Sequence, residues 1–126
     1  MPPIRIIATL LLLGTAIPTA QAAPTTDRGQ ISVAQVFEMI SRAPSDAVAR
    51  NTLNAYLAGV GEATGVLVSQ AQQIGAAPVH CGQSFNLDQQ LAVDALSAAV
   101  PDQDKWAQTP ATPIIIADMF SRAGCR

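Results

Sequence analysis

The sequence is poor in the residues that carry chemistry or bind charged partners. Of its 126 residues, 13% are charged and 4% are aromatic, and there is one histidine. The seven Lys and Arg residues form no basic run, which argues against nucleic acid and anionic membrane surfaces as partners. A lone histidine, His80, is too little for a zinc site, which needs three or four converging ligands. We therefore expect no metal and no cofactor.

Patterns of catalytic residues are also missing. Residues 59–64 (GVGEAT) superficially resemble a phosphate-binding loop, but no Gly-Lys-Ser/Thr follows them and no predicted strand precedes them. Ser and Asp residues could be grouped with His80 into a triad, but no nucleophile-elbow glycine pattern accompanies them. The nine acidic residues are scattered, as on a solvated surface. We expect a protein that is not an enzyme, with His80 as a loop residue.

An apolar run near the start indicates export. Residues 6–17 are almost wholly apolar and follow a short start that contains Arg5. Ala20, Gln21 and Ala22 supply the small-x-small pattern after which a signal peptidase cuts. The run is too short to span about 30 Å of hydrocarbon, and the leader has no cysteine for a lipid anchor. We expect a signal peptide over 1–22, cleavage after Ala22, and a periplasmic protein that is not inserted in the membrane.

What remains after cleavage is one small domain. Removing 22 of the 126 residues leaves 104, and the loss of Arg5 changes the net charge from −2 to −3. Alanine and glutamine are abundant and Val/Ile/Thr alternation is rare, a composition that favours helices over sheet. We divide the chain into a flexible polar tail over 23–30 and a helical domain over 31–126.

Both cysteines, Cys81 and Cys125, lie in the exported part. In an oxidising compartment such a pair normally forms a disulfide. The loop that this bond closes is long, and the chain-entropy model assigns it about 4 kcal/mol of stability. A reactive thiolate beside His80 is the alternative, but pairing removes the free thiol that it needs. We predict a Cys81–Cys125 disulfide.

Four segments have helical patterns. The first follows a capping box of Ser32 and Gln35 and is ended by Pro44. The third is opened by a capping signature at 86–89 and reaches about Val100. The fourth starts at Thr109 and Pro110 or at Thr112 and Pro113, and ends near Gly124 as cap residue; its three isoleucines could also form a buried strand, but the proline start favours helix. The sequence therefore predicts an all-α, four-helix domain closed by one disulfide.

The second predicted helix, from Ser45 or Asp46 to about Gln73, has two notable features. Three internal glycines each cost about 1 kcal/mol relative to alanine, and a closely approaching helix or a kink at 59–61 would explain them. One side carries an apolar stripe, which we expect to face the core: Leu53, Tyr56, Leu57, Val60, Leu67 and Ile74.

Trp106 lies in the loop after Pro101 and has two interpretations. It either seals one end of the domain as a partly buried ring, or it is an exposed anchor for a partner, since tryptophan is enriched at binding hot spots. An acidic, disulfide-bonded surface with one such anchor suits protein recognition better than chemistry. We keep Trp106 as a candidate partner contact.

Several motifs, taken in order, resemble a known family. They are YLAGV on a long helix, a later loop cysteine, a QL helix, a proline-ended helix and a last apolar helix that ends in cysteine: 56–60, Cys81, 90–91, 100–101 and Cys125. Their order, over roughly residues 33–126, resembles the Rap/Tai family of type VI secretion amidase immunity proteins.

The resemblance implies a periplasmic helical protein, often a dimer, that binds a peptidoglycan amidase effector toxin and blocks its active site. By position, Cys81 and Cys125 match the disulfide pair of the family. The chain departs from the family where Gly82 and Gln83 replace a proline after the first cysteine, and where Gly124 replaces a proline before the last. An amidase toxin and a second copy of the chain are thus the expected partners, and no residue matches well enough to name a plugging position.

Two other functions stay open on the residues alone. An acid-stress helical chaperone of the periplasm also carries one disulfide and loosens as carboxylates lose their charge near pH 4. The nine acidic residues permit this, but the dense Lys/Asp/Glu surface of such chaperones is absent. An envelope assembly factor is the third alternative.

Overall fold

The fold is entirely helical over the residues that the structure describes. The computed structural model of the chain describes residues 23, 25–76 and 80–126. It contains four α-helices and one short 3₁₀ helix: α1 (Val33–Arg42), α2 (Ala47–Gln73), α3 (Gln89–Ala99), Gln103–Lys105 and α4 (Ala111–Arg122). The only extended pairing among these residues is an isolated bridge between Ser32 and Pro110. The predicted all-α, four-helix fold is confirmed.

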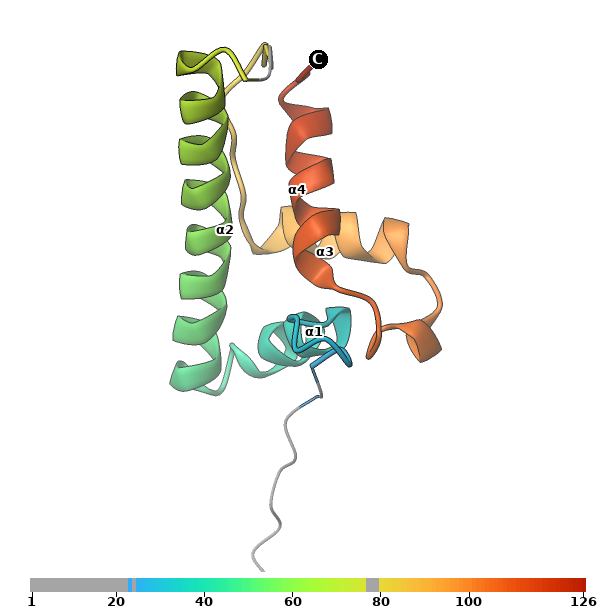
Figure 1. Ribbon diagram of the computed structural model, residues 1–126. Helices are drawn as coiled ribbons and strands as arrows, with labels where there is room; N and C mark the ends of the chain where they lie inside the picture. The colour runs from blue at the N-terminus through green and yellow to red at the C-terminus, as the bar shows by residue number, and fades with distance from the viewer. Residues whose placement is uncertain (1–22, 24, 77–79) are drawn as a thin grey trace, which may run out of the picture.

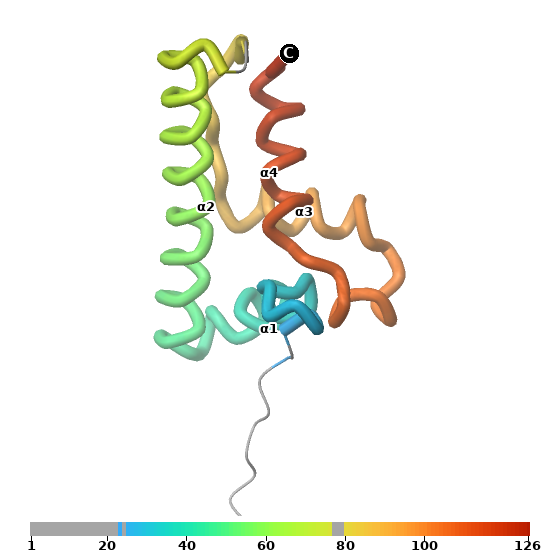
Figure 2. The backbone as a smooth tube through the Cα atoms, viewed as in Figure 1, coloured from blue at the N-terminus to red at the C-terminus, as the bar shows by residue number. Residues whose placement is uncertain are grey.

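The helices do not form a parallel-sided bundle. Figure 1 shows α2 and α4 running in the same direction, α3 crossing them, and α1 lying across the base of the molecule. α1 packs mainly on α2, and α3 packs mainly on α4. Figure 2 shows the chain after residue 80 descending from the level of the upper end of α2 to the start of α3. α2 thus packs mainly on α1 and to a lesser extent on α4.

Side chains cap α1, α2 and α3 at their starts, although the cap of α3 is Asp88 and not Asn86, with which the predicted signature opens. Ser32 and Gln35 form the reciprocal capping box at the start of α1, at 3.0 and 3.1 Å. Asp46 accepts from two backbone amides at the start of α2, and Asp88 accepts from the amide of Leu91 in α3. These oxygens satisfy amide donors that the first helical turn leaves without a partner. Gly124, at φ +63°, follows the end of α4 as expected.

A small core lies where the four helices meet. Its members with essentially no exposed surface are Val33, Val36, Leu53, Ala92, Leu96, Ala111, Ile115 and Met119. The stripe expected along α2 continues only as far as Val60, because Leu67 is 65% exposed and Ile74 is 77% exposed. The expectation that these last two face the core is therefore wrong. Figure 1 shows α4 reaching about the same level as the end of α2, but the side chains of Leu67 and Ile74 stay exposed.

The glycines inside α2 have no neighbour that explains them. α2 is continuous from Ala47 to Gln73, and Figure 1 shows it without a sharp bend. A Cβ atom built on Gly59, Gly61 or Gly65 meets nothing within 4 Å. Both interpretations offered from the sequence, a kink and a closely packed helix, are wrong for the described chain. The glycines leave this helix with an open surface.

Residues 25–30, expected to belong to a flexible tail, form a hydrogen-bonded turn. Thr26 is 5% exposed, and its backbone amide donates to the carbonyl of Gln30 at 3.0 Å. The amide of Asp27 donates to the side chain of Gln108 at 3.2 Å. The structure thus attaches this segment to the chain that precedes α4. The leader over 1–22, with its expected cleavage position at Ala22, lies outside the described residues.

Candidate binding surface

The predicted disulfide is present. Cys81 is bonded to Cys125, so the described chain has no free cysteine. The backbones of His80 and Arg126 exchange two hydrogen bonds, at 3.0 and 2.9 Å, beside this bond. The His80 side chain is exposed and lies in the loop, before the first cysteine. This region joins the chain after α2 to the end of α4.

Trp106 is engaged within the chain. Its ring stacks on Phe37 of α1, with centroids 4.2 Å apart, and its Nε1 donates to the carbonyl of Val100 at 2.8 Å. The ring is partly buried against the core. This geometry corresponds to the sealing role described above, and the partner-contact role of Trp106 stays a prediction.

An apolar hollow opens between α2 and α4. Its volume is about 380 Å³. α2 supplies most of its wall and α4 supplies the rest. The lining residues are Ala55, Tyr56, Gly59, Val60, Ala63, Thr64, Leu67, Thr112 and Ile116. No charged side chain lines this wall, and its only polar side-chain groups are the hydroxyls of Tyr56, Thr64 and Thr112. The hollow is open to solvent rather than enclosed.

The hydroxyl groups that line this hollow form hydrogen bonds between α2 and α4 and within α2. The Tyr56 hydroxyl and Thr112 Oγ1 are hydrogen-bonded at 2.9 Å and connect α2 to α4. Thr64 Oγ1 donates to the carbonyl of Val60 at 2.7 Å, so this buried threonine satisfies itself within α2. Burial raises the pKa of Tyr56 above its ordinary value, although the hydrogen bond to Thr112 works in the opposite direction. The phenol is therefore neutral at physiological pH and acts as a structural tie.

A second apolar hollow adjoins the first. It shares Thr112 and Ile116 with the first hollow and continues past Pro113 to Ile31. No charged residue lines either hollow. We call the two together the α2/α4 surface. Exposed apolar area of this kind, without charge, is typical of surfaces that contact another molecule.

Leu67 extends this surface along α2, since it lines the first hollow and is 65% exposed. The sequence analysis assigned Leu67 and Tyr56 to the core stripe and gave no role to Ala63. A second signal was present, because Ala55, Gly59, Ala63 and Leu67 recur every four residues and so lie along one side of a helix. That spacing could have identified the wall of the hollow.

Other kinds of site are not evident in the described chain. No group of three or more His, Cys, Asp or Glu side chains that could hold a metal occurs in residues 23, 25–76 and 80–126. Over the same described part, no helix combines the length and hydropathy needed to cross a membrane.

Comparison with protein-family models, with curated proteins and with solved structures finds no match to this chain. The resemblance to amidase immunity proteins therefore stays a prediction based on the motifs given above.

Proposed function

We propose that this chain is an exported, disulfide-bonded helical protein that binds a peptidoglycan amidase effector toxin and blocks it, with the α2/α4 surface as the contact. The observation that carries the proposal is that surface, which is open, apolar and free of charged residues. Hydrophobic area left uncovered on a small domain is a common mark of a protein-binding site. The leader pattern of 1–22 and the Cys81–Cys125 bond support a periplasmic location, with cleavage after Ala22.

The shape of the surface favours a protein over a small molecule. A small ligand is usually enclosed by its pocket over most of its area. Here two shallow hollows adjoin each other, and one of the residues that line the first, Leu67, is largely exposed. A protruding side chain or helix end of a partner fits such a shape. The choice of an amidase as that partner comes from the family resemblance.

Two alanines on α2 provide a matched pair of variants. Ala63 lines the hollow, whereas Ala58 is exposed and does not line it. Five residues separate them, which places them about 140° apart around the helix. Arginine at Ala63 would bring charge and bulk into the surface. Arginine at Ala58 makes the same chemical change on a different side of the same helix.

The test begins with the tagged mature chain and the lysate of its own organism. A captured cysteine–histidine amidase is then purified, its binding is measured, and it is expressed in the periplasm with or without this protein. We expect protection from lysis by the wild type and by Ala58→Arg, and an increase in Kd of about tenfold or more for Ala63→Arg. Circular dichroism establishes that both variants are folded.

Other outcomes separate the alternatives. Unchanged lysis in the presence of well-folded wild-type protein would refute the proposal. Capture of many unfolded envelope proteins, only at low pH, would instead favour the chaperone. Binding of a second copy to the same surface is measured by the molar mass of the mature chain in solution, which Ala63→Arg but not Ala58→Arg would then lower.

A further inference from the structure

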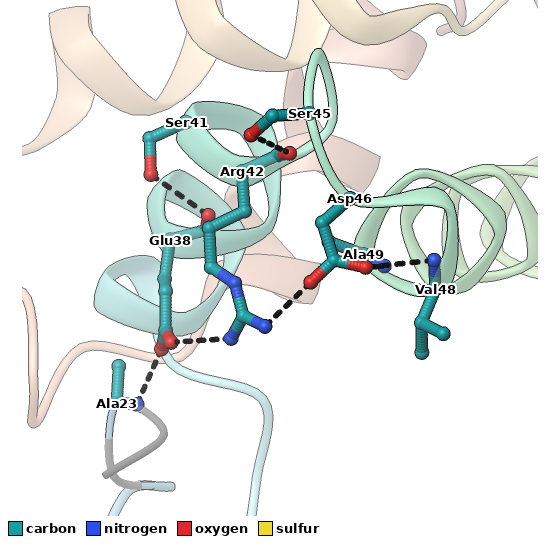
Figure 3. A network of polar contacts seen from close by, with 8 residues as sticks. All are labelled: Ala23, Glu38, Ser41, Arg42, Ser45, Asp46, Val48 and Ala49. Carbon is teal, nitrogen blue, oxygen red and sulfur yellow. Dashed lines mark hydrogen bonds and ion pairs between the residues drawn. The ribbon is translucent and has the colours of Figure 1, made fainter. Parts of the chain in front are cut away.

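Ala23 is the residue that would begin the chain after the proposed cleavage, and it already contacts a charged network. Its backbone nitrogen donates to Glu38 Oε2 on α1. The other oxygen of this carboxylate accepts from Arg42 Nη1 at 3.2 Å. Figure 3 shows these contacts, with the nitrogen of Ala23 pointing at the Glu38 carboxylate. One oxygen of this carboxylate thus accepts from Arg42 of the same helix, and the other accepts from the residue that would begin the mature chain.

The network continues to the start of α2. Arg42 Nη2 is 2.6 Å from Asp46 Oδ2, and Asp46 Oδ1 accepts from the amides of Val48 and Ala49. Two carboxylates and one guanidinium leave this group with one excess negative charge. Glu38 and Asp46 are only about a quarter exposed, at 26% and 28% of their side chains. A positive charge at the position of the Ala23 nitrogen would balance the group.

Cleavage supplies such a charge. Hydrolysis of the bond between Ala22 and Ala23 consumes one water, and the leader departs with the new carboxylate. The nitrogen of Ala23 changes from a neutral amide with one hydrogen to an ammonium with three. An ammonium donates a stronger, charge-assisted hydrogen bond to a carboxylate than an amide does.

We propose that Glu38 is the receptor site for the α-ammonium group that leader removal creates at Ala23. The mature N-terminus pairs with Glu38, completes the Glu38–Arg42–Asp46 network and fastens the first residues of the mature chain to the corner between α1 and α2. This inference rests on the proposed export and cleavage, and does not depend on which partner the α2/α4 surface binds.

The sequence makes a clean experiment available. Lys105 is the only lysine of the chain, and it pairs with Asp102 at an exposed position. In the Lys105→Arg background, a chain that begins at Ala23 has a single primary amine, its α-amino group. Acetylation of that amine removes the charge without changing any side chain. The same treatment of a Glu38→Gln variant completes a double-mutant cycle.

We expect acetylation to lower the Tm by about 2–4 °C when Glu38 is present, as for one surface ion pair in a domain of this size. In the Glu38→Gln background, acetylation should change the Tm by less than half as much. Glu62→Gln, on an exposed carboxylate of α2 outside the network, should keep the full effect. Equal effects of acetylation in the Glu38→Gln and Glu62→Gln proteins would overturn the proposal, as would no effect in either.

A second readout reports on the charge itself. The carboxylate of Glu38 should raise the pKa of the α-amino group above its ordinary range of about 7.7–8.0, so that acylation at pH 8 is slower than in Glu38→Gln. An unchanged rate would contradict the pairing. N-terminal sequencing of the exported protein tests the premise, because a first residue other than Ala23 would refute cleavage there. Protection against the amidase is measured separately, so failure of the partner assignment remains distinguishable.

Discussion

The two halves of α2 are held in different ways. Its core half (47–57) buries Ala49, Leu53 and Leu57 against the rest of the core. Its open half (58–73) buries only Thr64, and exposes Val66 and Leu67. The first half is fixed by apolar burial, whereas the second projects beyond it. The open half carries an apolar surface that α4 covers only in part, so the same helix serves for folding at one end and is available for contact at the other.

The largest expected effect comes from removing the disulfide at the far end of α4. The cysteines are 44 residues apart, and the chain-entropy model assigns their bond about 4 kcal/mol. Replacing both by alanine should lower the free energy of unfolding by about that amount in urea. The wild type treated with reductant provides the comparison.

The disulfide-free protein also sharpens the contrast between the halves. Trp106 reports on the core end, since it stacks on Phe37, whereas α2 is the longest helix and the largest single contributor to the circular dichroism. We expect the dichroism to decline at lower urea than the fluorescence once the bond is absent. Coincident transitions would show a single cooperative unit and would contradict the division made here.

Two leucines on α2 test the contrast directly. Leu53 is fully buried in the core half, and its change to alanine should lower the free energy of unfolding by about 3 kcal/mol, because a cavity remains. Leu67 is 65% exposed, so the same change there should alter stability by no more than about 0.5 kcal/mol. Urea unfolding measures both. Similar losses at the two positions would show that the open half is packed after all.

Local signals made much of this fold predictable from the sequence. Ser32, Asp46 and the 86–89 segment mark the helix starts because a side-chain oxygen there satisfies nearby amides, a requirement that depends on few residues. Within 86–89 the residue that caps α3 is Asp88. The disulfide was predictable because only one pairing of two cysteines exists. Gly124 was predictable because a helix end in the left-handed region favours glycine.

Features that depend on distant parts of the chain were not predictable in the same way. The 3-to-4 spacing predicted that both Leu53 and Leu67 face the core. Such spacing shows which side chains share one side of a helix, but it does not show whether another helix covers that side. How closely α1 and α4 approach each part of α2 is decided by the tertiary structure. The α2/α4 surface was missed for that reason, and so was the lack of any neighbour at Gly59.

A hydrogen bond between α2 and α4 offers the next test. Tyr56 and Thr112 meet at 2.9 Å where the core half of α2 approaches its end. Tyr56→Phe should lower the free energy of unfolding by about 1 kcal/mol, because it leaves the threonine hydroxyl without this partner. Thr112→Val and the double variant complete a cycle. A coupling energy near zero would show that burial alone holds the helices together here.

The glycines of α2 should give a change of similar size and opposite sign. Gly61→Ala and Gly65→Ala should each raise the free energy of unfolding by about 1 kcal/mol, because the new methyl groups meet nothing within 4 Å. Gly59→Ala should also stabilise, but it lies on the α2/α4 surface and should weaken partner binding. Gly75, at φ +66°, provides the control, since alanine there should destabilise. Destabilisation at Gly61 would reveal a packed neighbour.

The smallest effect concerns the corner where the core half of α2 begins. Amide donation from Ala49, followed by the hydrogen bond from Arg42, holds the pKa of Asp46 below its ordinary value. A lowered carboxyl pKa in the folded state adds stability above the unfolded pKa of about 3.9, and this is lost as pH falls through the folded value.

Asparagine still caps a helix but has no charge, so it isolates this contribution. The Tm of Asp46→Asn should therefore fall less steeply than that of the wild type as pH is lowered from about 5 toward 2. Parallel Tm curves for the two proteins would contradict the assignment. A difference confined to that acid range would show that the core half relies on an ionised cap as well as on burial, whereas the open half has no charged group of this kind lining its α2/α4 surface.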